Sequence, residues 1–263
     1  MLKFNSYYLD TPIIKGRAFD VFFPEEIKHK TQIFIVHGGG WRGGSRVSFH
    51  VIMEKLAELG YVCATSDYRL NAKDAFEQIS DLRDSYTAFV KLLEERGIAP
   101  RIAVYGESAG SHLASLLCYA NAGECGEIYN GEWVKPALAI LHATPVHFIP
   151  YEWMSDTLKS CIRSIAGASY EDAPEVYERL SLSSYVRQDN PKTFFIEAGN
   201  ESMFPSEYTK NIAEAHNRMG IPSFQKIYPN CEHGFFYDLT RKAQREAFDD
   251  ICKFIENDES QSL

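Results

Sequence analysis

The sequence predicts an α/β fold with a mostly parallel central sheet and helices on both of its faces. Short runs of β-branched and aromatic residues alternate with longer segments of helical periodicity along almost the whole chain. Several of the short runs are almost continuously apolar, as expected of parallel strands that are buried on both faces. A chain of 263 residues can bury a substantial core, and we expect one domain spanning residues 1–263.

The strands and helices are predicted from two different periodicities. The predicted strands combine high β-propensity with flanking turn residues, and they are Ala18–Phe23, Gln32–His37, Val62–Ser66, Ile102–Gly106, Ala137–His142, Thr193–Ala198 and Ser223–Tyr228. The predicted helices follow the 3.6-residue period of apolar positions, and they are Ser48–Leu59, Asp74–Arg96, Ala109–Asn121, Ser206–Met219 and Leu239–Glu256. Glycine directly follows some of these segments, which favours helix termination there.

The segment Thr144–Lys192 interrupts this alternation. It contains four prolines, several aromatic residues and only short helical fragments. Long connections in compact domains often carry function, so we expect residues 144–192 to form a small lid-like insertion over the active site. The alternative is an ordinary surface excursion packed on the edge of the sheet.

Composition limits the classes of partner. The formal net charge is −9 and the isoelectric point is about 5.4, which disfavours nucleic acid or an anionic membrane as a partner. The six cysteines lack CxxC spacing, so we expect reduced thiols and no metal site. The N-terminal residues contain no apolar signal-peptide core, and we expect a cytoplasmic protein that acts on a small molecule. The sequence leaves the oligomeric state open.

The run Gly106–Gly110, GlyGluSerAlaGly, predicts a nucleophile on a sharp turn between a strand and a helix. Ser108 follows the apolar run of a predicted strand and directly precedes a predicted helix. Glycines on either side allow strand and helix to approach closely. The alternative for the motif alone is a tight turn in which Ser108 caps the helix.

The run His37–Trp41, HisGlyGlyGlyTrp, predicts backbone N–H donors for an oxyanion. We expect Gly39 and Gly40 to supply donors from this loop and Ala109 to supply another from the helix N-terminus. The same glycines also fit the GxGxxG pattern of a dinucleotide site. That hypothesis requires a helix to open within the glycines, whereas helical periodicity begins only near Ser48.

A serine nucleophile requires a base and an acid that orients the base. Among eight histidines, His233 fits best, because it follows the last predicted strand and precedes the last helix. His142 and His147 remain harder to exclude. Glu201 is the predicted acid, since it is the only carboxylate between the strand Thr193–Ala198 and the next helix, and Asp238 is the alternative.

With these motifs in place, the chain resembles the α/β-hydrolase superfamily, and in particular its esterase/lipase branch of hormone-sensitive-lipase-like and acetyl esterases. Further matching segments are AspTyrArgLeu at 67–70, AspValPhePhePro at 20–24, MetPhePro at 203–205 and HisGlyPhe at 233–235. The resemblance implies the α/β-hydrolase fold, with Ser108 as nucleophile, His233 as base and Gly39, Gly40 and Ala109 as oxyanion donors. The acid loop of that branch usually carries Asp where this chain offers Glu201.

These observations predict a serine carboxylesterase that cleaves esters of small substrates through an acyl-enzyme on Ser108, without a cofactor. The related alternative is an amidase such as an arylformamidase, which would use the same triad. A third alternative is a non-catalytic ligand-binding protein on the same scaffold. The motifs identify neither the natural substrate nor the acyl-chain preference.

Overall fold

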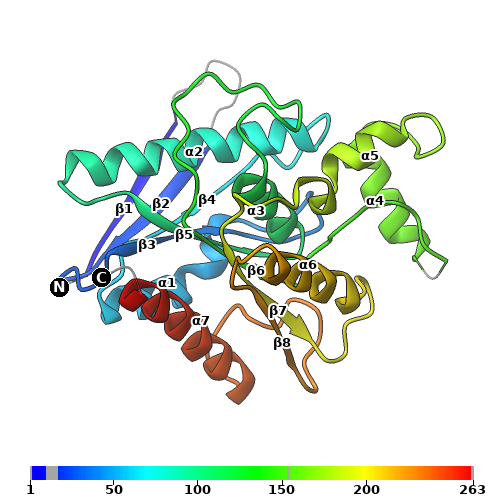
Figure 1. The fold of residues 1–263 in the computed structure, drawn as a ribbon. Coiled ribbons are helices and arrows are strands. Elements are labelled where there is room, and N and C mark those ends of the chain that lie inside the picture. The colour runs from blue at the N-terminus through cyan, green and yellow to red at the C-terminus, as the bar shows by residue number, and fades with distance from the viewer. Residues whose placement is uncertain (1, 10–16, 153, 262–263) are drawn as a thin grey trace.

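The computed structural model describes residues 2–9, 17–152 and 154–261, and it forms an eight-stranded sheet flanked by helices (Figure 1). The strand order is β1-β2-β4-β3-β5-β6-β7-β8. The strand β2 pairs antiparallel with both β1 and β4, and every pairing from β4 to β8 is parallel. The predicted α/β class and its mostly parallel sheet are therefore confirmed.

The strands lie close to the predicted segments. Their bounds are β1 Lys3–Tyr8, β2 Ala18–Phe23, β3 Thr31–Val36, β4 Cys63–Ser66, β5 Arg101–Glu107, β6 Leu138–His142, β7 Lys192–Ala198 and β8 Phe224–Tyr228. The strand β1 was not predicted from the sequence. Its residues are almost all exposed at the edge of the sheet, so no buried face gives it a clear apolar pattern.

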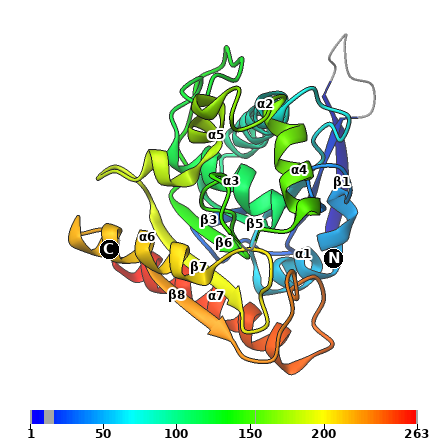
Figure 2. The same ribbon diagram turned by 90° about the vertical axis from the view of Figure 1, so that its right-hand side faces the viewer.

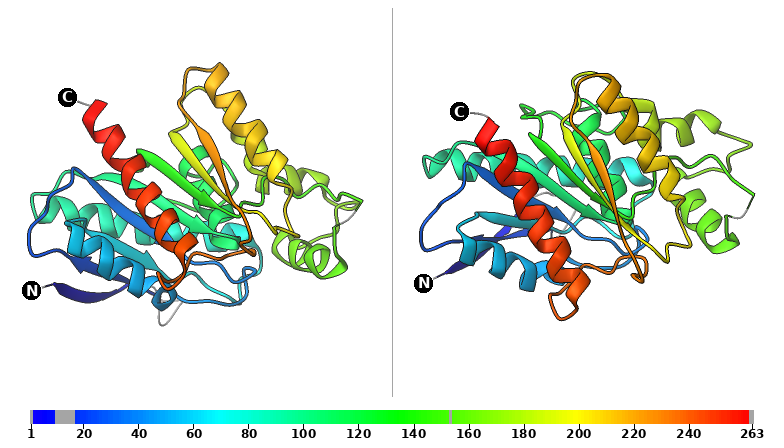
Figure 3. Two further views of the ribbon diagram at one scale, coloured as in Figure 1. Left: turned by 90° about the horizontal axis from the view of Figure 1, so that it is seen from below. Right: turned by 60° about the horizontal axis from the view of Figure 1, so that its bottom comes forward.

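The helices cover both faces of the sheet. Their bounds are η1 Arg46–Phe49, α1 His50–Leu59, α2 Ala75–Glu95, α3 Ala109–Tyr119, α4 Asp156–Ala166, α5 Pro174–Leu180, η2 Leu182–Tyr185, α6 Ser206–Arg218 and α7 Lys242–Gln261. The helices α1 and α7 lie in front of the sheet in Figure 3 and pack with Ile33 and Ile35 of β3. Helices α2 and α3 pack on the opposite face with Phe34 and Val36, as strand alternation requires.

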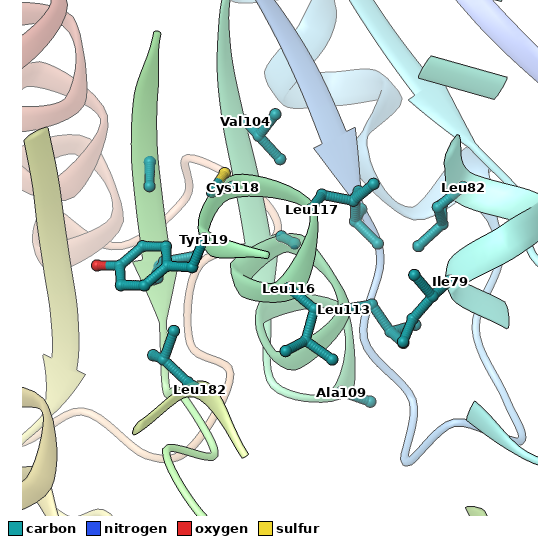
Figure 4. Packing of buried hydrophobic residues seen from close by; sticks show 14 of the residues in the cluster. Ile79, Leu82, Val104, Ala109, Leu113, Leu116, Leu117, Cys118, Tyr119 and Leu182 are labelled. Atoms are coloured by element: carbon teal, nitrogen blue, oxygen red, sulfur yellow. The ribbon is translucent and has the colours of Figure 1, made fainter. Parts of the chain in front are cut away.

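The helix α3 is buried along its whole length. Figure 4 shows Leu113 and Leu117 of α3 facing Ile79 and Leu82 of α2, with Val104 of β5 nearby. Complete burial fixes α3 rigidly against β5, and the turn between these two elements therefore has a well-defined geometry.

The segment 144–192 contains the helices α4 and α5, which lie on the α3 side of the sheet (Figure 2). Ser155 caps α4 by accepting a hydrogen bond from the Leu158 N–H at 3.2 Å. Leu158 and Ile162 of α4 and Tyr177 of α5 are buried in the same cluster as α2 and α3. Apolar contacts thus hold the segment at the end of the sheet where β6 ends.

Candidate active site

Ser108 lies on a strained turn between β5 and α3. Its φ of 53° falls in the left-handed region, which non-glycine residues rarely adopt. A Cβ added to Gly106 would overlap the Gly110 carbonyl, and one added to Gly110 would overlap the backbone of Val36 and His37. The two glycines are therefore required by close packing of strand and helix. Strain of this kind persists where the surrounding structure enforces it, often at functional sites.

The Ser108 hydroxyl is hydrogen-bonded to a histidine from the loop that follows β8. His233 Nε2 lies 2.7 Å from Ser108 Oγ, although the two residues are 125 positions apart in the sequence. The side chain of Ser108 is largely buried, with 8% of the residue exposed. This distance allows direct proton transfer between the hydroxyl and the imidazole.

The other ring nitrogen of His233 is hydrogen-bonded to a carboxylate. Nδ1 lies 2.6 Å from Oε2 of Glu201, in the loop between β7 and α6. The second carboxylate oxygen, Oε1, accepts from the backbone N–H groups of Met203 at 2.7 Å and Phe204 at 3.3 Å. Both oxygens are thus held in place, and the side chain of Glu201 is 3% exposed.

Electrostatics favour an ionised Glu201 and a basic His233. Burial disfavours the charged form of Glu201, but the hydrogen bond and charge of His233 and the two backbone N–H groups lower the pKa of its carboxyl. Burial likewise disfavours protonated His233. The hydrogen bond to Glu201, its charge and the charge of Glu107 together raise the pKa of His233 above its usual value. The arrangement therefore stabilises an imidazolium.

Among the described residues, the side chains of the alternative acid and the alternative bases have other contacts. Asp238 is bonded to the backbone N–H and hydroxyl of Thr240, at 3.0 and 2.9 Å. His142 is fully buried against the Tyr105 hydroxyl, and burial lowers its pKa to about 3. His147 packs edge-on against Tyr208. In the described part of the chain, the structure brings His233 and Glu201 to Ser108 and leaves Asp238 in a local turn.

The glycine loop runs directly from the end of β3. Gly39 and Gly40 have φ values of 120° and 58°, and the Gly39 carbonyl accepts from the Gly43 N–H at 2.9 Å. A Cβ added to Gly40 would meet no atom within 4 Å, so this glycine borders open space. No helix opens between residues 38 and 45, all of which are described, because η1 begins at Arg46. The dinucleotide hypothesis is therefore wrong.

One hydrogen bond connects the glycine loop with α3. The Trp41 indole N–H donates to His112 Nδ1 of α3 at 3.0 Å, which ties the glycine loop to the helix that carries Ala109. Ala109 is the first residue of α3, and its N–H consequently has no acceptor within the helix. The amides of Gly39, Gly40 and Ala109 are thus on the two segments that flank Ser108.

Two further acidic residues lie near the site, and sequence reasoning missed the first of them, Glu107. Glu107, the residue before Ser108, places its carboxylate against Gly38 and Gly234. Glu197 of β7 is 1% exposed and accepts from the Thr209 hydroxyl at 2.8 Å, and burial raises its pKa to about 8. The position of Glu107 inside the nucleophile motif was a usable signal. The position of Glu197 within the predicted strand Thr193–Ala198 favours a hydrogen-bonded side chain in the helix layer over a solvated charge, and the contact with Thr209 of α6 agrees with this.

The fold, with a serine, a histidine and a glutamate at the carboxyl ends of β5, β8 and β7, defines a protein of the α/β-hydrolase class. The sequence model of the BD-FAE family matches residues 19–215. The chain therefore belongs to the BD-FAE family, which agrees with the resemblance of its motifs to the esterase/lipase branch.

Two curated relatives are proteins of Mycobacterium tuberculosis. The "Probable carboxylic ester hydrolase LipM" is 36% identical over 217 residues, covering 77% of this chain and 49% of LipM. "Esterase LipQ" is 24% identical over 230 residues, covering 81% of this chain and 52% of LipQ. The chain therefore spans about half the length of the curated relatives it matches.

Solved structures share the fold at low sequence identity. Esterase B from Lactobacillus Rhamnosis (HN001) matches with a TM-score of 0.79 and 17% identity, covering 99% of this chain and 87% of esterase B. Thermogutta terrifontis esterase 2 phosphonylated by sarin matches with a TM-score of 0.76 and 19% identity, covering 92% and 90%. Among the helices of the described residues, none has both the length and the apolar character needed to cross a membrane.

Proposed function

We propose that this protein is a serine hydrolase that cleaves carboxylic esters of small substrates through an acyl-enzyme on Ser108. The observation that carries the proposal is the continuous chain of hydrogen bonds from Ser108 through His233 to Glu201, at 2.7 and 2.6 Å. The esterase names of the relatives LipM and LipQ support the same reaction class.

The reaction begins when Ser108 Oγ attacks the ester carbonyl carbon while His233 Nε2 takes the hydroxyl proton. Glu201 holds the neutral ring with its proton on Nδ1 and stabilises the imidazolium that forms. Collapse of the tetrahedral intermediate expels the alcohol, which receives the proton from His233. Water, deprotonated by the same ring, then attacks the acyl-enzyme; the bond to Ser108 Oγ breaks, His233 returns the proton to Ser108 Oγ, and the acid is released.

The oxyanion of each tetrahedral intermediate requires donors that are already in place. We assign this role to the backbone N–H groups of Gly39, Gly40 and Ala109. The free first-turn amide of α3 and the open space beside Gly40 support the assignment. No organic cofactor or metal takes part in the proposed steps.

Residues 144–192 are proposed to cover this site as a lid-like insertion on a single α/β-hydrolase domain, residues 1–263. The Tyr151 hydroxyl donates to the Met203 carbonyl, two residues beyond Glu201. Phe148 packs edge-on against Trp41 of the glycine loop, with ring centroids 5.7 Å apart. Both contacts support a position for the insertion between the acid loop and the glycine loop, where it would shape the pocket for the acyl or alcohol group.

Amide cleavage is the second candidate. The chain is 34% identical over 92 residues to arylacetamide deacetylase of Oryctolagus cuniculus, which covers 32% of this chain. An amidase, including an arylformamidase, would use the same three residues with an amine as the leaving group.

The acidic composition of the chain suits a small neutral or weakly charged substrate for either reaction. The six free cysteines support a reducing, cytoplasmic setting.

Turnover of matched ester and amide substrates tests the proposal. We expect hydrolysis of p-nitrophenyl esters of short acyl chains, and a chain-length series alongside acetylated sugars and N-formylkynurenine would rank the leaving groups. Ser108→Ala should abolish the activity, whereas Ser183→Ala, at an exposed serine of η2, should retain it. Equal rates for Ser108→Ala and the unmodified protein would reject the proposal.

A further inference from the structure

Glu107 joins three segments of the site from the position just before the nucleophile. Its carboxylate lies against Gly38, at the start of the glycine loop, and against Gly234, the residue after His233. The register of the sheet explains the first approach, because Gly106 of β5 pairs with Val36 of β3 and each chain continues alongside the other. One side chain thus lies between the segments that carry the nucleophile, the oxyanion donors and the base.

Both approaches are possible only because the contacted residues are glycines. A Cβ built on Gly38 or Gly234 would fall onto a Glu107 carboxylate oxygen, Oε2 in the first case and Oε1 in the second. Gly234 also has a φ of 65°, which favours glycine. The carboxylate is therefore enclosed by backbone from two sides, and a side chain of other shape would leave a gap between the loops.

We propose that Glu107 is a positioning residue that fixes the glycine loop and the His233 loop against the nucleophile turn and places a second negative charge beside the imidazolium. The inference rests on the proposed function, and it deepens that function by assigning a role to a residue outside the Ser108–His233–Glu201 chain. Glu201 orients the ring through a direct hydrogen bond, whereas Glu107 acts on the ring through its charge and on both loops through packing.

The groups that face His233 and Glu107 determine the sign of the charge effect. Glu201 and Glu107 raise the pKa of His233 against the effect of burial. The neutral ring of His142, at the end of β6, is buried close by. Burial raises the pKa of Glu107, with a further increase from Glu201, while the charge of His233 and the Gly38 N–H oppose that shift. Tyr68 and Tyr105 also face Glu107, and burial and its charge raise their pKa values.

The electrostatic part of the proposal predicts a displaced pH profile. Neutral His233 is the active base, so activity rises as the pH increases through the pKa of His233. Glu107→Gln removes a negative charge and keeps nearly the same volume, so the pKa of His233 should fall. The midpoint of the kcat/KM profile should therefore move to lower pH by about half a unit or more.

The packing part predicts a loss in kcat. Glu107→Ala opens a gap between Gly38 and Gly234, and the oxyanion donors and His233 should lose their mutual alignment. We expect kcat to fall by about tenfold or more with a much smaller change in KM, because the donors act mainly on the transition state. Glu107→Gln should retain most of kcat at its own optimum.

The experiment measures full pH profiles of kcat and KM for the unmodified protein, Glu107→Gln, Glu107→Ala and a charge control. Glu232→Gln is the control, since Glu232 directly precedes His233 but is exposed and paired with Arg241 at 2.7 Å. The control should leave the midpoint in place. A midpoint shift below about 0.2 pH units in Glu107→Gln, in an active protein, overturns the inference alone. If Ser108→Ala has the same activity as the unmodified protein, the proposed function is overturned as well.

Discussion

Replacing Glu201 by Gln tests the acid assignment most sharply, because the substitution changes charge and proton donors while preserving shape. In the native site, one carboxylate oxygen accepts from the Met203 and Phe204 amides and the other accepts from His233 Nδ1. A Gln at this position has one acceptor oxygen. If that oxygen keeps the two backbone donors, its NH₂ group faces Nδ1 and forces the ring into the tautomer with a proton on Nε2.

That tautomer cannot accept the Ser108 proton, since Nε2 is the nitrogen that faces the hydroxyl at 2.7 Å. The opposite orientation of the amide would place an NH₂ group against two backbone N–H groups, which is unfavourable in a side chain that is only 3% exposed. We therefore expect Glu201→Gln to lower kcat by about 10³- to 10⁴-fold, equivalent to about 4–5.5 kcal/mol of transition-state stabilisation.

The assay compares kcat and kcat/KM for a short-chain p-nitrophenyl ester between the unmodified protein, Glu201→Gln and Asp238→Asn. Asp238 is partly exposed and its carboxylate is hydrogen-bonded to Thr240 in a local turn, so its substitution should change kcat less than about twofold. Far-ultraviolet circular dichroism would establish that both variants are folded. A Glu201→Gln variant with more than about a tenth of the original kcat would refute the tautomer argument. Loss of activity in Asp238→Asn instead would transfer the acid role to Asp238.

The remaining predictions concern backbone packing, proton uptake and stability. Gly106→Ala should destabilise the protein by about 2 kcal/mol or more in urea unfolding, because its Cβ would overlap the Gly110 carbonyl; an unchanged midpoint contradicts the close approach. The kcat/KM profile should have its acidic limb above pH 6.5, the usual pKa of histidine, since the pKa of His233 is raised; a limb below that value contradicts the ion pair with Glu201. Burial raises the pKa of Glu197 from 4.5 to about 8, so between these pH values the folded protein keeps Glu197 protonated whereas the unfolded chain does not. The free energy of unfolding therefore falls as the pH rises across that window. As the pH rises from 5 to 8, the free energy of unfolding of Glu197→Gln should therefore increase by about 2 kcal/mol or more relative to that of the unmodified protein. A constant difference between the two free energies of unfolding would show that Glu197 is ionised in the folded protein.

The sequence was sufficient to predict the three interacting side chains because of the topology it also predicted. Ser108, Glu201 and His233 each follow a predicted strand, and the carboxyl ends of parallel strands meet at one edge of a sheet. Spatial proximity across 125 residues therefore followed from strand order and loop position. The Asp238 alternative could not be excluded in this way, because it lies in the same loop region as His233.

The edge strand β1 shows where local patterns fail. Lys3–Tyr8 buries no regular face, so its strand conformation depends on pairing with β2, from Lys3 opposite Phe23 to Tyr8 opposite Ala18.

The boundaries of helices also depend on contacts outside the helix. The last helix begins at Lys242 rather than at the predicted Leu239, since Asp238 and Thr240 form their own hydrogen-bonded turn.

Glu107 and Glu197 could not be interpreted from sequence because their properties arise from tertiary packing. The position of Glu107 becomes meaningful only when Gly38 and Gly234 approach it from distant parts of the chain. Glu197 acquires its raised pKa from complete burial beside Thr209 of α6. The place of Glu107 in the GlyGluSerAlaGly run and of Glu197 in a predicted strand are local signals, but neither identifies these contacts.

Identification of the residue modified by a fluorophosphonate tests the central claim most directly. The protein is incubated with the reagent, digested and analysed by mass spectrometry while esterase activity is followed in parallel. We predict one adduct on the peptide that contains Ser108, formed in step with loss of activity and absent from Ser108→Ala. A folded protein that remains unlabelled, or that loses activity through an adduct on another residue, would contradict the assignment of Ser108 as the nucleophile.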